Sequence, residues 1–220
     1  MNRKHILEVI KQAKAESKPR NFKQTYDLII NLKNLDLKNP AQQLDFFVTL
    51  PHPKGKLQKV CALVGPELAD EARKYCTTTI IQDEFDAYQK DKKKIKKLAE
   101  EHDWFIAQAN IMAKVAQVFG SVLGPRGKMP NPKAGCVVPP KASLGPLVEK
   151  LQKTVHVKAK DKNSPVVHLS VGREDMPDEE VAENIATLYD QVLHHLPGEH
   201  NNIKSVFLKL TMGKPVKMEQ

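Results

Sequence analysis

Two kinds of apolar pattern divide this chain and limit the folds that it can adopt. Continuous apolar runs at 60–65 and 104–107 predict strands that are buried on both faces, as in a parallel sheet. Nearer the two ends, residues 26–32, 44–50 and 155–160 alternate between apolar and polar side chains. Alternation predicts strands with one buried and one exposed face. The middle and the ends therefore belong to different kinds of sheet.

Helical spacing and breaker residues place the other elements. We expect helices over 6–13, 67–75, 83–101, 111–119, 143–153 and 178–194, with the fourth ending at Gly120. Further strands are expected over 78–81, 165–171 and 203–212, and residues 121–141 hold too many glycines and prolines for regular structure. Strands alternate with helices in the middle, which predicts a doubly wound α/β unit.

Each end of the chain supplies half-exposed strands and one amphipathic helix, which is too little apolar surface for a separate domain. Together the two ends would make a layered α+β domain of ordinary size. The middle unit would then be an insertion into this split domain. Two chain crossings would join the parts and could act as a two-strand hinge.

The net charge of +9 and the pI near 9.3 favour a polyanionic partner, although solubility explains such an excess nearly as well. Residues 1–60 hold 12 basic and 5 acidic side chains, so most of the excess lies there. No apolar run is long enough for a membrane helix, and no signal peptide is evident, so we expect a cytoplasmic protein without a membrane partner. Three scattered cysteines and eight histidines show no metal-ligand spacing, so no metal is expected.

The segment 123–133 combines glycines, prolines and the cations Arg126, Lys128 and Lys133. Exposed backbone N–H groups and positive charge could hold phosphates, and a structural loop with solvated lysines is an equal alternative. The nucleotide-binding loop of phosphate-transfer enzymes is excluded, because Met129 stands where Ser or Thr is required and Val122 where the first glycine is required. No nucleophile–base set or Gly-rich dinucleotide fingerprint is found, so we expect neither catalytic residues nor a cofactor.

The run 209–215 ends a strand in glycine and proline between lysines. Thr211 offers a hydroxyl, Met212 an apolar surface and Gly213 a bare backbone. The residues alone favour the simpler interpretation, plain strand termination. A DNA-binding regulator is disfavoured, because the helix expected over 178–194 begins with acids that would repel a groove.

Four motifs carry a resemblance that spans the chain. Residues 123–133, Leu210-Thr-Met-Gly213, Phe22 followed by Thr25, and Leu50-Pro-His52 with Gly55-Lys56 together resemble the ribosomal protein L1 family. The run 18–22 looks most like the archaeal branch. The chain departs from the family at Pro53, where glycine is expected.

The resemblance implies a fold and a set of contacts. It implies a split, main RNA-binding α+β domain of residues 1–62 and 154–220 and an inserted Rossmann-like α/β domain of residues 63–153. The implied RNA-binding residues are Phe22, Thr25, Lys158, Lys160, Lys162, His168, Thr211, Met212 and Gly213. Secondary RNA contacts would come from Arg126, Lys128 and Lys133.

The resemblance also implies the partners. The chain would be a non-enzymatic constituent of the large ribosomal subunit that binds its RNA at the mobile stalk. It would assist the release of deacylated tRNA from the exit site, and it would repress translation by binding its own messenger RNA. We expect a monomer when it is free.

Overall fold

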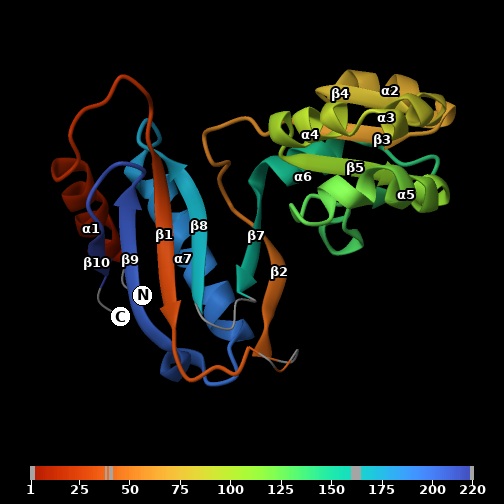
Figure 1. The fold of residues 1–220 in the computed structure, drawn as a ribbon. Helices are drawn as coiled ribbons and strands as arrows, with labels where there is room; N and C mark the ends of the chain where they lie inside the picture. The colour runs from red at the N-terminus through yellow and green to blue at the C-terminus, as the bar shows by residue number, and fades with distance from the viewer. Residues whose placement is uncertain (1–2, 38, 40–41, 160–164, 219–220) are drawn as a thin grey trace. The chain divides into compact units, whose positions relative to one another are not determined.

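The computed structural model describes residues 3–37, 39, 42–159 and 165–218. The chain forms two compact units, and it passes between them twice. Unit 1 contains residues 1–56 and 153–220, and unit 2 contains residues 57–152. The predicted fold class is confirmed as a mixed α/β fold with one antiparallel and one parallel main sheet (Figure 1). The domain bounds and the hinge predicted from the sequence stay predictions.

Unit 1 is built around an antiparallel sheet in the order β10-β9-β1-β8. Its elements are α1 (Arg3–Ala15), β1 (Thr25–Leu32), β2 (Leu44–Thr49), β7 (Thr154–Ala159), β8 (Val166–Arg173), α7 (Asp178–His195), β9 (Ile203–Leu210) and β10 (Val216–Met218). A short 3-10 helix, η6 (Glu199–Asn202), precedes β9. Strands β2 and β7 pair antiparallel as a separate ribbon.

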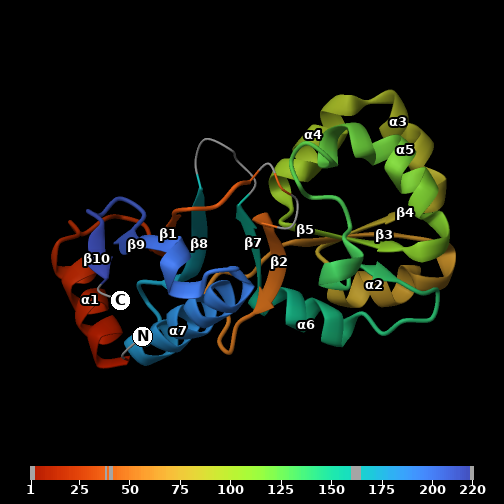
Figure 2. The ribbon, with the colours of Figure 1, turned by 90° about the horizontal axis from the view of Figure 1, so that it is seen from below.

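Helices α1 and α7 lie on the same side of this sheet (Figure 2). In β1 every second side chain is buried, and these side chains join one core with apolar residues of both helices. Hydrophobic burial therefore explains the alternation seen in the sequence. The other face carries half-exposed or exposed side chains, among them Asp27, Ile29, His168, Phe207 and Lys209. We call it the open face.

Unit 2 holds a parallel sheet in the order β4-β3-β5-β6. Its elements are β3 (Val60–Val64), η2 (Pro66–Leu68), α2 (Ala69–Tyr75), β4 (Thr78–Ile81), η3 (Gln82–Glu84), α3 (Phe85–Lys90), α4 (Lys92–Glu101), β5 (Trp104–Gln108), η4 (Ala109–Ile111), α5 (Met112–Leu123), η5 (Pro132–Ala134), β6 (Val137–Val138) and α6 (Gly145–Lys153). Helices α3, α4 and α5 cover one side of the sheet, and α2 and α6 the other (Figure 2). All five residues of β3 are therefore buried.

The single charged helix predicted over 83–101 is wrong, because the structure has two helices there. Asp91 leaves helical geometry at φ −126° and ψ 87°, and its carboxylate accepts hydrogen bonds from the N–H groups of Lys93 and Lys94. An aspartate is a favoured N-cap, so it starts a new helix at the point where the earlier helix ends. Because α4 starts anew at this break, its Ile95, Leu98 and Ala99 face the core.

Two helix or strand ends and one short strand also differ from the prediction. Helix α5 continues through Gly120 to Leu123, because one glycine costs only about 1 kcal/mol in a helix and Val122 and Leu123 extend its buried stripe. The segment predicted to be irregular over 121–141 contributes β6, which pairs with β5. The last long strand ends at Leu210 rather than at 212, and β10 follows it.

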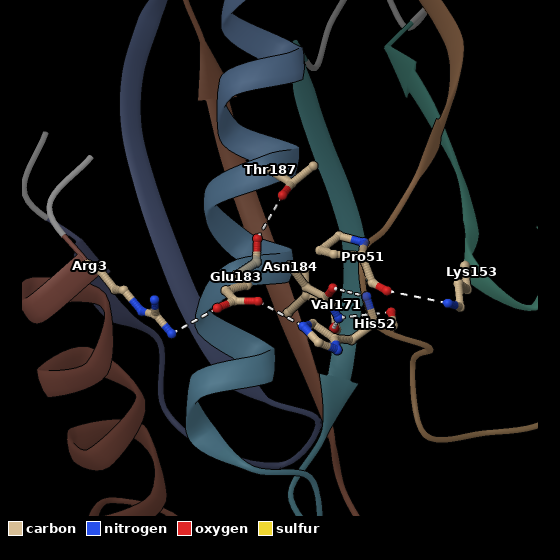
Figure 3. A network of polar contacts seen from close by, with 8 residues as sticks. All are labelled: Arg3, Pro51, His52, Lys153, Val171, Glu183, Asn184 and Thr187. Carbon is tan, nitrogen blue, oxygen red and sulfur yellow. Dashed lines mark hydrogen bonds and ion pairs between the residues drawn. The ribbon is translucent and has the colours of Figure 1, made fainter.

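A buried amide ties the segment after β2 to α7. The Asn184 side chain accepts a hydrogen bond from the His52 N–H at 3.1 Å, and donates to the carbonyls of His52 at 3.2 Å and Val171 at 2.9 Å (Figure 3). The His52 ring bonds Glu183 at 2.8 Å, and Glu183 also pairs with Arg3 of α1. These contacts satisfy buried backbone groups that no strand pairs.

Candidate nucleic-acid interface

Thr25 and Thr211 meet at one end of the unit 1 sheet although 186 residues separate them in sequence. Pairing of β1 with β9 places Tyr26 opposite Leu210, so each threonine stands next to a paired residue. The Thr211 N–H donates to the Thr25 carbonyl at 3.0 Å, and the Thr25 N–H donates to the Thr211 hydroxyl oxygen at 3.1 Å. The Thr211 hydroxyl donates to the same carbonyl at 3.3 Å. These bonds fix both backbones at an exposed edge.

The Gln24 side chain holds the next residue of this edge. Gln24 is only 2% exposed, and its amide oxygen accepts a hydrogen bond from the Met212 N–H at 3.0 Å. Its amide nitrogen donates to the Ser17 hydroxyl at 3.0 Å. The Gly213 N–H then donates to the Leu210 carbonyl at 2.9 Å and closes a tight turn. Sequence reasoning missed Gln24, because a lone glutamine before a strand carries no local signal of burial.

Two large apolar side chains remain exposed beside these bonds. Phe22 is 51% exposed and Met212 is 58% exposed, while most large apolar residues of the unit are buried. Exposed apolar side chains beside fixed backbone form the kind of surface that a partner can cover. The structure thus brings together four of the predicted RNA contacts, Thr25, Thr211, Met212 and Gly213, and the fifth, Phe22, lies three residues before Thr25 in the chain. We call this surface the Thr211 edge.

The other predicted contacts of unit 1 lie apart from this edge. His168 is exposed on the open face, where it pairs with Ile29. Burial raises the pKa of Asp27 on this face, and the nearby charges of Lys209 and His168 partly oppose that rise. Lys158 is exposed on the separate β2–β7 ribbon, opposite Asp45. Lys160 and Lys162 lie outside the described residues.

Two of the three predicted cations of the Gly/Pro segment, Lys128 and Arg126, have partners within unit 2. The Lys128 ammonium donates to the carbonyls of Ala99 at 2.8 Å and His102 at 2.7 Å, at the C-terminal end of α4. Arg126 pairs with Glu100 at 3.0 Å. Lys133 is exposed. Positive charge at a helix C-terminus is stabilising, so Lys128 has a structural role whether or not it contacts RNA.

Two other kinds of site are absent from the described residues. These residues form no group of three or more His, Cys, Asp or Glu side chains suited to a metal ion. Across the same residues, no helix has both the length and the apolar character needed to cross a membrane.

Comparisons with known proteins agree with the resemblance seen in the sequence. The model of the Ribosomal protein L1p/L10e family matches residues 11–214. Large ribosomal subunit protein uL1 of Methanothermococcus thermolithotrophicus is 46% identical over 100% of both chains. The proteins of the same name from Thermococcus kodakarensis and Pyrococcus abyssi are 41% and 42% identical, over 100% and 99% of this chain and 99% and 97% of theirs. This chain therefore belongs to the ribosomal protein L1 family, as predicted, and is a structural protein of the large ribosomal subunit rather than an enzyme.

Proposed function

We propose that this protein binds large-subunit ribosomal RNA at the mobile stalk through the Thr211 edge. The observation that carries the proposal is the exposure of Phe22 and Met212 beside the bonds that join Thr25 to Thr211. Hydrogen bonds hold the backbone at Met212 and Gly213, which suits a preformed RNA shape because little backbone freedom is lost there on binding.

The chemistry of the Thr211 edge matches what folded RNA offers. Proteins recognise such RNA by shape, by contacts to 2′-hydroxyls and phosphates, and by stacking on unpaired bases. Phe22 supplies a face for stacking, Met212 an adaptable apolar contact, and Thr211 a hydroxyl that can also face solvent. Hydrogen bonds at the edge would set specificity, and cations around it would set the salt dependence.

The flanking cations complete the proposed interface. Lys158 and His168 are exposed in the same unit, and Lys160 and Lys162 follow Lys158 in sequence. We assign these four residues to phosphate contacts of the RNA. Arg126, Lys128 and Lys133 are assigned to secondary contacts with ribosomal RNA or tRNA.

The test is equilibrium binding of the purified protein to a fragment of the large-subunit RNA stalk over a salt series. An unrelated RNA of equal length is the control. We expect tight binding to the stalk fragment that persists at a salt concentration where the unrelated RNA has dissociated. Equal and steeply salt-sensitive binding to both RNAs would mean that the net charge of +9 acts without a specific site.

The Thr211→Val variant tests the edge itself. Valine keeps the branched shape and removes the hydroxyl, so affinity for the stalk fragment should fall by about 1–3 kcal/mol, the range for a lost buried hydrogen bond. A second test compares Met212→Ala with a control, Leu57→Ala. Leu57 is also exposed, at 85%, but it belongs to unit 2. Only Met212→Ala should weaken binding. A folded Thr211→Val protein with unchanged affinity would remove Thr211 from the site.

Two further roles rest on the family resemblance. The protein would assist release of deacylated tRNA from the exit site, and it would repress translation by binding its own messenger RNA. If both RNAs use the Thr211 edge, they must compete for it. The stalk fragment should therefore displace a leader segment of the messenger RNA, and Thr211→Val should weaken both complexes by the same factor. A variant that loses affinity for only one of the two RNAs would show that they bind at different sites.

A further inference from the structure

A pocket of about 390 Å³ opens in unit 1 behind the Thr211 edge. Its walls come from the end of α1, the segment that leads into β1, the segment after β8 and the last residue of β9. The lining residues are Lys14, Ser17, Lys18, Pro19, Arg20, Lys23, Gln24, Glu174 and Leu210. The pocket therefore lies between elements that the fold holds firmly and the exposed segment 18–23.

The pocket is strongly basic. Four basic side chains line it and one carboxylate, Glu174, faces them, which leaves a formal charge of +3. Lys14 has a partner, Asp178 at the start of α7. Lys18, Arg20 and Lys23 are exposed, and none of them has an ion pair with any residue that the structure describes.

Arg20 differs from the other arginines of the chain in having no carboxylate partner among the described residues. Arg3, Arg73, Arg126 and Arg173 each pair with a carboxylate. In the described part of the chain, Arg20 is the arginine without such a partner. A planar guanidinium with five donors is suited to bidentate contact with phosphate oxygens.

One buried side chain joins the pocket to the Thr211 edge. Gln24 lines the pocket, donates to Ser17 on the same wall, and accepts the Met212 N–H on the other side. Leu210, which precedes Thr211, also lines the pocket. A strand of RNA that places a base or ribose on Met212 would therefore carry its backbone past the pocket.

We propose that this pocket is a phosphate subsite, in which Arg20 and Lys18 bind one backbone phosphate of the RNA held at the Thr211 edge. The inference rests on the proposed function and deepens it. The pocket supplies charge without base readout, so it fixes the register of the RNA while the edge reads its shape. Gln24 acts as a positioning residue that keeps the two parts in a fixed relation.

The first experiment measures the salt dependence of stalk RNA binding for Arg20→Gln and Lys18→Gln. Each substitution should lower affinity for the stalk fragment and reduce the slope of log affinity against log salt by up to about 0.7–0.9, the contribution of the one phosphate contact that the two side chains share. The matched control is Lys11→Gln, which removes an exposed charge of α1 that does not line the pocket. Its slope should equal that of the natural protein. Thermal unfolding of all three variants checks that they fold.

The second experiment removes the phosphate charge instead. Stalk fragments that carry a single methylphosphonate linkage are scanned for the position that weakens binding to the natural protein. At the linkage held by the pocket, the same change should weaken binding by Arg20→Gln less than it weakens binding by the natural protein, because one of the two contacts with that phosphate is already lost. At every other linkage the two effects should add.

The outcomes separate the subsite from the function on which it rests. If Met212→Ala weakens stalk binding but Arg20→Gln and Lys18→Gln behave like Lys11→Gln, the pocket is not a phosphate subsite, and the Thr211 edge stands. If the effects of Arg20→Gln add to those of every methylphosphonate, the subsite is likewise overturned. If the natural protein does not prefer the stalk fragment at all, the proposed function fails, and the subsite fails with it.

Discussion

The two main sheets of this protein are covered by helices in different ways. The parallel sheet of unit 2 has helices on both sides, so its central strand β3 is buried throughout (Figure 2). The sheet of unit 1 has both helices on one side, and its strand β1 alternates between buried and half-exposed residues. A sheet covered on both sides can bind only through its loops, whereas the sheet of unit 1 keeps a face and an edge available. This difference agrees with placing the main RNA contacts in unit 1.

The cations that we assign to RNA contacts in unit 2 also differ from those around the pocket of unit 1. In unit 2, Lys128 and Arg126 are bonded to the end of α4 and to Glu100. In unit 1, Lys18, Arg20 and Lys23 have no ion pair with any residue that the structure describes. A basic residue that completes a helix end serves the fold, whereas we propose that the basic residues around the pocket serve a ligand. A count of lysines and arginines in the sequence cannot separate these two kinds.

The largest expected effect compares the same substitution in the core of unit 2, on α5, and on the open face of unit 1. Phe119 is fully buried in unit 2 and meets Phe85 edge to face with ring centroids 5.3 Å apart, so Phe119→Ala should cost about 3–5 kcal/mol in unfolding free energy. Phe207 lies on the open face and is half-buried, so Phe207→Ala should cost about 1 kcal/mol. Urea unfolding measures both. Equal losses would mean that the open face is covered in solution.

The second test asks how far unit 1 depends on buried polar contacts. Asn184→Ala leaves the His52 N–H and the carbonyls of His52 and Val171 without this partner, so the unfolding free energy should fall by about 2–3 kcal/mol. The control is Thr187→Ala on the same helix, whose hydroxyl only donates to the Glu183 carbonyl one turn earlier. It should change the stability by less than about 0.5 kcal/mol. A small effect of Asn184→Ala would mean that water replaces the amide.

The third test sharpens the contrast between the two kinds of cation. Lys128→Met removes two hydrogen bonds to the end of α4, so the unfolding free energy of the protein should fall by about 1–2 kcal/mol. Lys133→Met, an exposed control in the same segment, should leave stability unchanged. Of the two substitutions, Lys128→Met should cause the smaller loss of affinity for RNA. If Lys128→Met weakens RNA binding without destabilising the fold, its role is that of a ligand contact.

The smallest effect is a dependence on pH in unit 1. The hydrogen bond with His52 and the charge of Arg3 hold the pKa of Glu183 below its ordinary value of 4.5. Since this pKa is lowered on folding, the stabilisation is present above 4.5 and is lost as the pH falls through the lowered value. The difference in melting temperature between the natural protein and Glu183→Gln should therefore be constant near neutral pH and disappear in acid. A difference that persists in acid would assign the effect to packing.

The sequence by itself determined the kind of each sheet and most of the elements. Period-two alternation at the ends and the continuous run at 60–65 predict which faces are buried, because the pattern of apolar residues along a strand is contained in its own sequence. The errors lay at Asp91, at Gly120 and in the 121–141 segment. There a cap, a buried stripe and a pairing with β5 overrode the local preference.

The tertiary structure alone decided how residues far apart in sequence meet. The order β10-β9-β1-β8 puts Thr25 beside Thr211 and lets a buried Gln24 hold Met212 next to a basic pocket. The sequence motifs named the two threonines, but neither the partner of Gln24 nor the difference between Lys128 and Arg20 could be read from them. Strand order and long-range pairing arise from the packing of the whole unit, so no short stretch of sequence records them.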